Sequence, residues 1–239
     1  TTFAPFQTMR CCEQIKVNLG YMHNKVCMVG LASGLVLGPL GFTHCCIEDL
    51  SIMRSIPGIT VLSPSDCLET IKAVEAALMH NGPVYIRLTG GSTSPQVYKK
   101  NYNFKIGEAI ELKEGKDITI FSTGSMVYPS LNVANLLDKI GINASVINIH
   151  TIKPLDEEII IRSAKKTNAV VSAEEHNFLG GLGESISRTL STNYPVPQEF
   201  VATNDTFGES GTPFELIKKY GLDSDSIVES VKKVISRKK

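Results

Sequence analysis

The side chains with the clearest chemical potential lie near the start of the chain. Phe3 and Phe6 stand three residues apart where a short strand passes into a helix, and His44 ends the glycine-rich loop Gly38-Pro-Leu-Gly-Phe-Thr-His44. Aromatic faces suit stacking on a planar ring as well as packing in a core. A histidine titrates near neutral pH, which suits proton transfer. By their chemistry alone the two phenylalanines favour a core position, so a ring-binding role needs further support.

A second group of candidate residues lies later in the chain. Glu174-Glu-His176 is followed by Gly180-Gly-Leu-Gly183, which lacks the G-x-G-x-x-G spacing of a dinucleotide-binding loop and favours a tight turn. A histidine beside two glutamates favours structural hydrogen bonding. We therefore expect Glu175 and His176 to affect stability and assembly more than turnover. Three other histidines have no suggestive neighbours and are expected at the solvent or at a boundary: His23, His80 and His150.

Bulk properties exclude several classes of partner. The 239 residues are 42% hydrophobic, enough for a substantial core, and 24 basic residues balance 24 acidic ones. Such a chain has no basic field for nucleic acid or an anionic membrane. Its apolar stretches are too short to span a bilayer. We expect neither nucleic acid nor a membrane as a partner.

The cysteines fall at positions 11, 12, 27, 45, 46 and 67, all in the first third of the chain. None has the C-x-x-C spacing of a zinc site, and we expect no metal ligands in these residues. Scattered, buried thiols in a reducing compartment are the simplest interpretation. This predicts a cytoplasmic protein.

Strand and helix patterns alternate along the chain, which favours an α/β fold with mainly parallel sheets flanked by helices. Asp66 predicts a helix N-cap, with Glu69 completing a capping box. Apolar residues at helical spacing then predict a core-facing stripe: Leu68, Ile71, Val74 and Leu78. The other expected strands cover 26–30, 59–62, 84–88, 117–122, 144–149 and 169–173, and the other expected helices cover 47–55, 126–140, 156–166, 184–190, 213–220 and 224–236.

One polar stretch divides these elements into two groups. From Thr89 to Tyr102 the sequence turns polar and rich in glycine, serine and threonine. Such a shift in composition is typical of a domain boundary. We predict two domains, over residues 1–100 and 101–239, each with a mainly parallel sheet.

Ordered motifs extend this interpretation over essentially the whole chain. The aromatic pair, strand, glycine loop and histidine resemble the pyrimidine-binding domain of transketolase-like thiamine diphosphate enzymes. The later motifs resemble the transketolase C-terminal domain: Thr151-Ile-Lys-Pro-Leu-Asp-Glu-Glu158, Glu174-Glu-His176, Gly180-Gly-Leu-Gly183 and Phe207-Gly-Glu-Ser-Gly211. By this resemblance the chain is the C-terminal section of a transketolase, as in split transketolases. Thr1 is not an initiator methionine, and we expect the sequence to begin in mid-domain.

The resemblance implies a cofactor and a partner. Phe6, with Phe3, would stack on the aminopyrimidine of thiamine diphosphate, and His44 would be the catalytic residue that moves protons near the substrate hydroxyls. The family's catalytic glutamate would lie upstream of Thr1, and its Gly-Asp-Gly diphosphate and metal motif is not in the sequence. We therefore expect an N-terminal transketolase section to hold most of the Mg²⁺ and diphosphate site, within a homodimer or heterotetramer.

The resemblance also marks substrate positions that depart from ordinary transketolases. Ala32 stands where a histidine contacts the substrate phosphate, Leu40 where an aspartate binds a sugar hydroxyl, and Gly90 where an arginine binds the phosphate. Loss of these donors removes most of a phosphate clamp. His44 would complete the substrate site, and Ser92, Thr93 or the partner could contact a larger group. We expect a changed sugar specificity.

The function expected from the resemblance is thiamine diphosphate-dependent transfer of a two-carbon ketol unit between sugars. Two alternatives share the two-domain arrangement, the β subunit of a 2-oxo-acid dehydrogenase and a deoxyxylulose phosphate synthase. The Phe207-to-Gly211 motif and the Tyr220-Gly-Leu222 ending favour transketolase. A third alternative is an assembly subunit that has lost catalysis.

Overall fold

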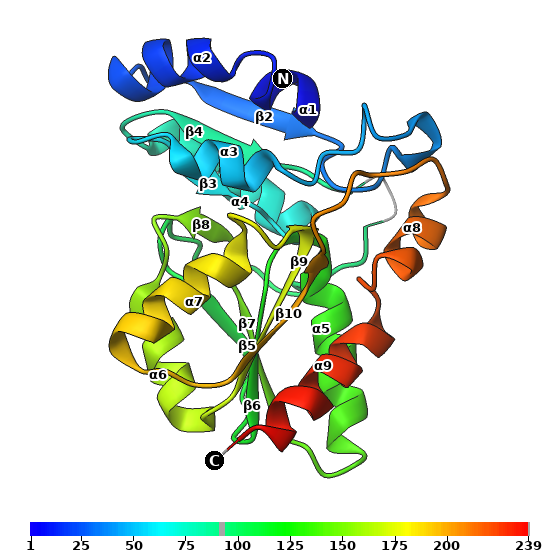
Figure 1. The fold of residues 1–239 in the computed structure, drawn as a ribbon. Helices are drawn as coiled ribbons and strands as arrows, with labels where there is room; N and C mark the ends of the chain where they lie inside the picture. The colour runs from blue at the N-terminus through cyan, green and yellow to red at the C-terminus, as the bar shows by residue number, and fades with distance from the viewer. Residues whose placement is uncertain (91–93, 239) are drawn as a thin grey trace.

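The computed structural model describes residues 1–90 and 94–238, which fold around two five-stranded sheets. In Figure 1 the sheet of the N-terminal part, blue to cyan, lies above the second sheet, green to orange, and helices flank both. Most neighbouring strands in each sheet run parallel. The predicted α/β class is confirmed.

The first sheet has the strand order β1-β2-β4-β3-β8. The first four strands are parallel, whereas β8 pairs antiparallel with β3. Because β8 comes from beyond residue 100, the later part of the chain contributes to both sheets, and the boundary at residue 100 stays a prediction. The strands are β1 (Thr2–Phe3), β2 (Cys27–Leu31), β3 (Thr60–Leu62), β4 (Val84–Arg87) and β8 (Thr151–Lys153).

Helices cover both faces of the first sheet. Alternate residues of a strand point to opposite faces, and in β4 the Tyr85 ring joins a cluster with Leu50 of α3, while Val84 and Ile86 join one with Ala73 of α4. Helices α3 and α4 therefore lie on opposite faces. The helices here are α1 (Ala4–Thr8), α2 (Cys12–Gln14), η1 (Ile15–Tyr21), η2 (Gly38–Leu40), α3 (Asp49–Ser55) and α4 (Cys67–Met79).

The predicted core stripe of α4 is wrong. Ala73 and Ala77 face the sheet and are buried, whereas Ile71 is 56% exposed and Leu78 is 62% exposed. Small side chains let the helix approach the strands closely, which turns the larger apolar residues outward. Helical spacing identified the helix, but it could not tell which of two overlapping stripes faces the sheet.

The capping box of α4 forms only in half. Asp66 Oδ1 accepts a hydrogen bond from the backbone nitrogen of Glu69 at 2.8 Å, as predicted. The Glu69 carboxylate accepts instead from the backbone nitrogen of Ser65 at 2.7 Å and from the Tyr102 hydroxyl at 2.9 Å. Glu69 is fully buried, so its charge is held by donors from the preceding turn and from a later segment.

The second sheet has the order β10-β9-β6-β7-β5, with β5 antiparallel at one edge. In Figure 1, α5 and α9 lie on one side of it and α6 and α7 on the other. Its strands are β5 (Ile110–Lys113), β6 (Ile118–Ser122), β7 (Ala144–Asn148), β9 (Val170–Asn177) and β10 (Gln198–Thr203), and its helices are η3 (Gly124–Met126), α5 (Val127–Asp138), α6 (Glu157–Thr167), α7 (Leu182–Asn193), α8 (Pro213–Lys219) and α9 (Ser224–Ser236).

The hydrophobic core continues from one sheet to the other. Leu50 and Met53 of α3 belong to the same cluster as Phe121 of β6 and Leu182 of α7. Leu35, from the loop after β2, joins the cluster formed by the second sheet with α5 and α9. The two sheets are therefore held together by apolar packing as well as by polar contacts.

Two expectations about single residues are corrected. His150 is not at the surface, because its ring is fully buried and stacks on Phe104 with centroids 4.2 Å apart. All six cysteines are free thiols, but only Cys45 and Cys46 are buried. Within the described residues no helix has both the length and the apolar character needed to cross a membrane.

Candidate cofactor and substrate site

The candidate residues of the first sheet follow the carboxyl ends of parallel strands. Phe3 ends β1, Ala32 follows β2, and Gly90 comes three residues after β4. β2 lies between β1 and β4, so these positions share one edge of the sheet. Ligands of open parallel sheets bind at this edge. The structure thus brings together residues that are far apart in the sequence.

An aromatic cluster forms at this edge. The Phe6 and His44 rings meet edge to face with centroids 5.1 Å apart, and Phe3 lies 6.1 Å from Phe6 and 6.2 Å from His44. The Arg10 guanidinium lies over the Phe6 ring at 4.0 Å from its centroid. His44 Nδ1 shares a 3.0 Å hydrogen bond with the Thr43 hydroxyl. Phe3 remains 38% exposed, so the cluster is open to a ligand.

His44 is carried by a loop whose two ends are joined. The backbone nitrogen of Gly34 donates to the Cys46 carbonyl at 2.7 Å, and that of Cys46 donates to the Gly34 carbonyl at 2.9 Å. We call residues 34–46 the His44 loop. Gly34 has φ +75°, a left-handed conformation that glycine adopts without strain. The turn η2 presents Leu40 outward, and its side chain is 56% exposed.

Ala32 and Gly90, which the family resemblance marks as substrate positions, follow the ends of adjacent strands. The backbone nitrogen of Ser33 donates to the Leu88 carbonyl at 2.9 Å, which places the ends of β2 and β4 side by side. Ala32 has φ +53°, which costs an L-residue roughly 1 kcal/mol and is held by the surrounding hydrogen bonds. Leu40 lies further along the chain, in the His44 loop.

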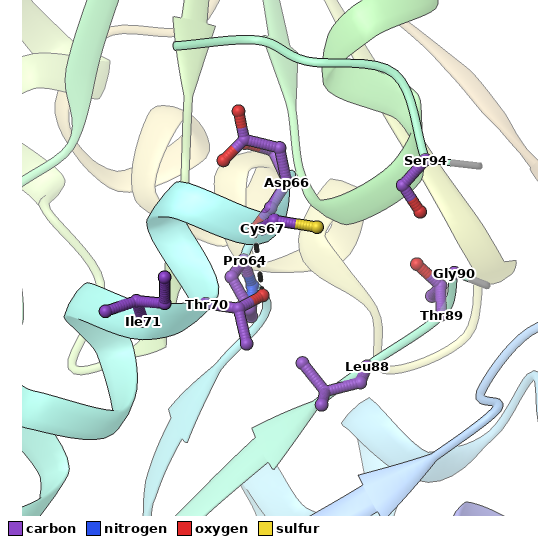
Figure 2. Close-up of a pocket in the computed structure, with 10 residues that line it drawn as sticks. Pro64, Asp66, Cys67, Thr70, Ile71, Leu88, Thr89, Gly90 and Ser94 are labelled. Atoms are coloured by element: carbon purple, nitrogen blue, oxygen red, sulfur yellow. Dashed lines mark hydrogen bonds between the residues drawn. The ribbon is translucent and has the colours of Figure 1, made fainter. Parts of the chain in front are cut away.

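A hollow of about 350 Å³ lies beside Gly90. Figure 2 shows it between the start of α4 and the segment after β4, with the Cys67 thiol pointing into it and the Asp66 carboxylate turned away. No basic side chain is among the described residues that line it: Pro64, Ser65, Asp66, Cys67, Thr70, Ile71, Leu88, Thr89, Gly90 and Ser94. Ser92 and Thr93 lie outside the described residues.

A buried ion pair lies beneath this edge. The Asp49 carboxylate accepts hydrogen bonds from Arg87 Nε at 2.9 and 3.0 Å and from the Tyr85 hydroxyl at 2.7 Å. Arg87 Nη2 donates to the carbonyls of Cys46 at 3.3 Å and Glu175 at 2.8 Å. Burial lowers the pKa of Arg87, but Asp49 and Glu175 raise it more, so the guanidinium stays charged.

Glu174, within β9, holds the start of α7. Its two oxygens accept from the backbone nitrogens of Leu182 at 2.7 Å and Gly183 at 2.8 Å. Burial raises the pKa of this carboxyl to about 7, although the two donors oppose the shift. A Cβ at Gly181 would stand 2.2 Å from Oε2 of Glu174, so a side chain at position 181 would displace this carboxylate.

His176 holds the start of α3, the helix that packs on one face of the first sheet. Its Nε2 accepts from the backbone nitrogens of Leu50 at 3.2 Å and Ser51 at 3.4 Å, while Nδ1 donates to the Asn177 carbonyl at 2.6 Å. This pattern fixes a neutral ring with its proton on Nδ1. Burial lowers the pKa of His176 to about 4.

Comparison with known proteins identifies this arrangement. The transketolase pyrimidine-binding domain matches residues 1–95, and the transketolase C-terminal domain matches residues 107–227. The 6-deoxy-6-sulfo-D-fructose transketolase subunit of Clostridium sp. (strain MSTE9) is 42% identical over 99% of this chain and 73% of that protein. The chain belongs to the transketolase family.

Other relatives support the same assignment. Human transketolase is 34% identical over 99% of this chain, which spans 38% of the human protein. A solved structure described as an inactive β4 tetramer of a split-gene transketolase has a TM-score of 0.93 at 40% identity and covers 100% of this chain and 76% of its own. The predicted transketolase-like transferase is confirmed, and its reaction is thiamine diphosphate-dependent ketol transfer.

The geometry fits part of the transketolase cofactor. The aromatic cluster offers apolar ring faces and one imidazole at an open sheet edge, which suits an aminopyrimidine. The Arg10 guanidinium covers one face of Phe6, so that face is already occupied in this structure. No group of three or more His, Cys, Asp or Glu suited to a metal ion occurs in residues 1–90 and 94–238.

Several residues of the site escaped sequence reasoning. Arg10 gave no signal because its contact with Phe6 depends on how the chain turns after α1. Asp49 and Arg87 are separated by 38 positions, and only their strand and helix partners bring them together. Phe42 and Phe207 also meet, with centroids 6.0 Å apart, since the Phe207-to-Gly211 segment packs on the His44 loop.

Proposed function

We propose that this chain and an N-terminal transketolase section together form the active site of a thiamine diphosphate-dependent ketol transferase. The observation that carries the proposal is the cluster of Phe3, Phe6 and His44 at the carboxyl edge of the first sheet. Residues that the family resemblance marked separately thus converge on one open edge. The relatives named as transketolase subunits support a partner chain.

In this proposal the phenylalanines bind the aminopyrimidine. Phe6 stacks on the ring and Phe3 shields its edge, since both are aromatic and only partly buried. The bound cofactor supplies a site that adds to a ketose carbonyl and stores the transferred two-carbon unit. The work of this chain is to hold the pyrimidine in place and to exclude water from one side of it.

His44 moves protons in this proposal. Its Nδ1 is engaged with Thr43, which leaves Nε2 as the atom that donates to or accepts from a substrate hydroxyl. The contact with Phe6 places the imidazole beside the ring platform, where the reacting end of a sugar would lie.

The Mg²⁺ ion and the diphosphate are assigned to the N-terminal section. That section would carry the Gly-Asp-Gly motif, and the assembly would be a homodimer or heterotetramer. Free thiols at all six cysteines agree with a reducing compartment, and we propose that the enzyme works in the cytoplasm.

The substrate proposal rests on Ala32, Leu40 and Gly90. The first and third stand together at the ends of β2 and β4, and the hollow beside Gly90 is without a basic side chain in its described lining. A phosphate that loses one charged partner binds less tightly by about 1.5–3 kcal/mol, or about one to two decades. We propose a sugar without a terminal phosphate at this position, or with a larger group there. Relatives are named for 6-deoxy-6-sulfo-D-fructose and for apulose 4-phosphate, so the family alone does not fix the substrate.

Cofactor calorimetry tests the shared active site. The isolated chain is expected to bind thiamine diphosphate weakly with Mg²⁺ present, and the chain with its N-terminal section to bind it tightly and transfer ketol units. Micromolar binding to the chain alone would contradict the division of the site. Tight binding by the assembled protein without transfer on any sugar would favour an assembly subunit instead.

A comparison of sugars tests the substrate proposal. The specificity constants of the assembled enzyme are measured for xylulose 5-phosphate and for non-phosphorylated or modified ketoses. We expect the modified ketoses to react better. A clear preference for xylulose 5-phosphate would show that other residues rebuild the phosphate clamp.

A further inference from the structure

One carboxylate of the second sheet reaches the loop that carries His44. Glu175 lies near the end of β9, and its Oε1 accepts a hydrogen bond from the backbone nitrogen of Leu35 at 2.7 Å. Its Oε2 accepts from the Ser125 hydroxyl, at the β6–α5 connection. The Glu175 residue is buried, with 6% of its surface exposed. Glu175 therefore ties the base of the His44 loop to the second sheet.

The fit at this base leaves little freedom. A Cβ on Gly34 would stand 2.3 Å from Oε1 of Glu175, so the carboxylate lies directly against the glycine. The paired hydrogen bonds between Gly34 and Cys46 close the loop at the same level. A shift of the carboxylate would thus move both ends of the His44 loop together.

The remainder of the loop depends on this base. The backbone nitrogen of Gly38 donates to the Leu35 carbonyl at 2.9 Å, and that of His44 donates to the Gly41 carbonyl at 3.0 Å. Through these hydrogen bonds, a displacement of Leu35 would also displace His44. The segment before α8 also touches the middle of the loop, where the Gly211 nitrogen donates to the Gly38 carbonyl at 3.2 Å. Among the described acidic side chains, Glu175 is the one that accepts a hydrogen bond at the base of the loop.

We propose that Glu175 is a positioning residue for ketol transfer: its carboxylate fixes the base of the His44 loop and thereby holds His44 against Phe6. This inference rests on the proposed role of His44. It assigns to Glu175 a part in turnover, whereas the sequence suggested an effect on stability and assembly. His176, which holds α3 instead of the loop, keeps the structural role.

Two readouts test the proposal. The first is the His44 ring-proton NMR signal of the full chain, assigned with His44→Gln, because ring currents of Phe6 displace it. The second is steady-state kinetics of the assembled enzyme. In Glu175→Ala we expect the signal to move and kcat to fall by about 10- to 100-fold, since a shift of about 1 Å can cost that much. The cofactor affinity should stay unchanged.

Matched variants separate positioning from general damage. Glu175→Gln can accept from Leu35 and donate to Ser125, so it should restore both readouts. Ser125→Ala removes one partner without touching the loop and should have an intermediate effect, which also keeps the test valid if Glu175→Ala does not fold. His176→Asn, from the same strand, should leave the His44 signal and kcat of folded enzyme unchanged.

Two results would overturn the proposal. One is a His44 signal in Glu175→Ala, or in Ser125→Ala if the former is unfolded, that matches the wild type. The other is an equal loss in Glu175→Ala and His176→Asn. If the protein proves inactive on every sugar, the proposed function fails, but the NMR comparison still decides whether Glu175 positions His44.

Discussion

The open edge of the first sheet and the buried seam between the sheets differ in what their side chains can do. At the edge, Phe3, Phe6 and His44 are partly exposed and meet mainly through ring contacts. In the seam, Glu174 and His176 are buried, and each is engaged by backbone groups. The seam is richer in ionisable groups, but the edge is where a ligand can approach.

This difference shows that a shifted pKa does not by itself mark an active site. Perturbed pKa values cluster at catalytic centres, but buried structural networks produce them too. Glu174 and His176 have their pKa values moved by burial, and their donors and acceptors are already used to hold the starts of helices. The two regions differ because the open edge has an atom that can contact a substrate, whereas the polar atoms of Glu174 and His176 in the seam are already used.

The largest effect is expected when the ion pair between Asp49 and Arg87 in the buried seam is broken. In Arg87→Met, the Asp49 carboxylate stays buried and, of its two described side-chain donors, keeps the Tyr85 hydroxyl alone. Removing one member of a buried pair typically costs about 3–5 kcal/mol. We expect urea unfolding of the isolated chain to show a loss of that size.

Two controls show whether charge is the cause. The double variant Asp49→Asn with Arg87→Met should recover part of the loss, because no uncompensated charge remains. Lys105→Met breaks an exposed pair with Glu108 and should change stability by less than about 0.5 kcal/mol. An equal loss in the single and double variants would assign the effect to packing.

The next effect concerns pH. The pKa of Glu174 is raised from 4.5 to about 7, so the folded chain takes up a proton between these values that the unfolded chain does not. Acidification through this range therefore stabilises the fold. The pKa of His176 is lowered from 6.5 to about 4, so there the unfolded chain takes up the proton and acidification destabilises the fold. The two contributions nearly cancel.

Substitution of Glu174 or of His176 should reveal the pH dependence of stability that the other residue contributes. Between pH 6.5 and 4.5, Glu174→Gln should lose about 2–3 kcal/mol more stability than the wild type, and His176→Asn should gain a similar amount relative to it. Urea unfolding at the two pH values measures both. Glu175, whose pKa burial also raises, contributes equally to all three proteins. Parallel pH profiles for the three would contradict the cancellation.

Local patterns predicted the fold better than the contacts at its seam. The helix over 224–236 matches α9, and the alternation of strands and helices gave the two sheets. The strands β5, β8 and β10 went unpredicted, because β8 has three residues and the other two are partly exposed edge strands. Short or edge strands bury too few apolar residues to leave a clear pattern.

The residues of the candidate site were also predicted only where local motifs marked them. Family motifs pointed to Phe6 and His44, and the structure places them in contact, although their roles stay proposals. Sequence gave no sign that Glu175 touches Leu35, since the two are 140 positions apart and meet only when both sheets are packed. Long-range hydrogen bonds between backbone and side chain leave no spacing to recognise.

A smaller effect is expected at the open edge of the first sheet. Phe6→Ala removes the central ring of the cluster and should weaken thiamine diphosphate binding to the assembled enzyme by about 1–3 kcal/mol. That corresponds to about 5- to 150-fold in the dissociation constant. Phe42→Ala is the matched control, because Phe42 is exposed and meets Phe207 instead of His44. An affinity unchanged by Phe6→Ala would return this ring to a packing role.

The smallest effect is expected on the outer face of α4. In the isolated chain Leu78→Ser should change stability by less than about 0.5 kcal/mol, because this side chain is mostly exposed. Ala77→Leu, one position away, faces the first sheet and should cost about 1–3 kcal/mol through overpacking. Thermal or urea unfolding compares the two. The opposite ranking would mean that the predicted stripe of large apolar residues faces the core after all, and that the exposed face of this helix has been assigned to the wrong side.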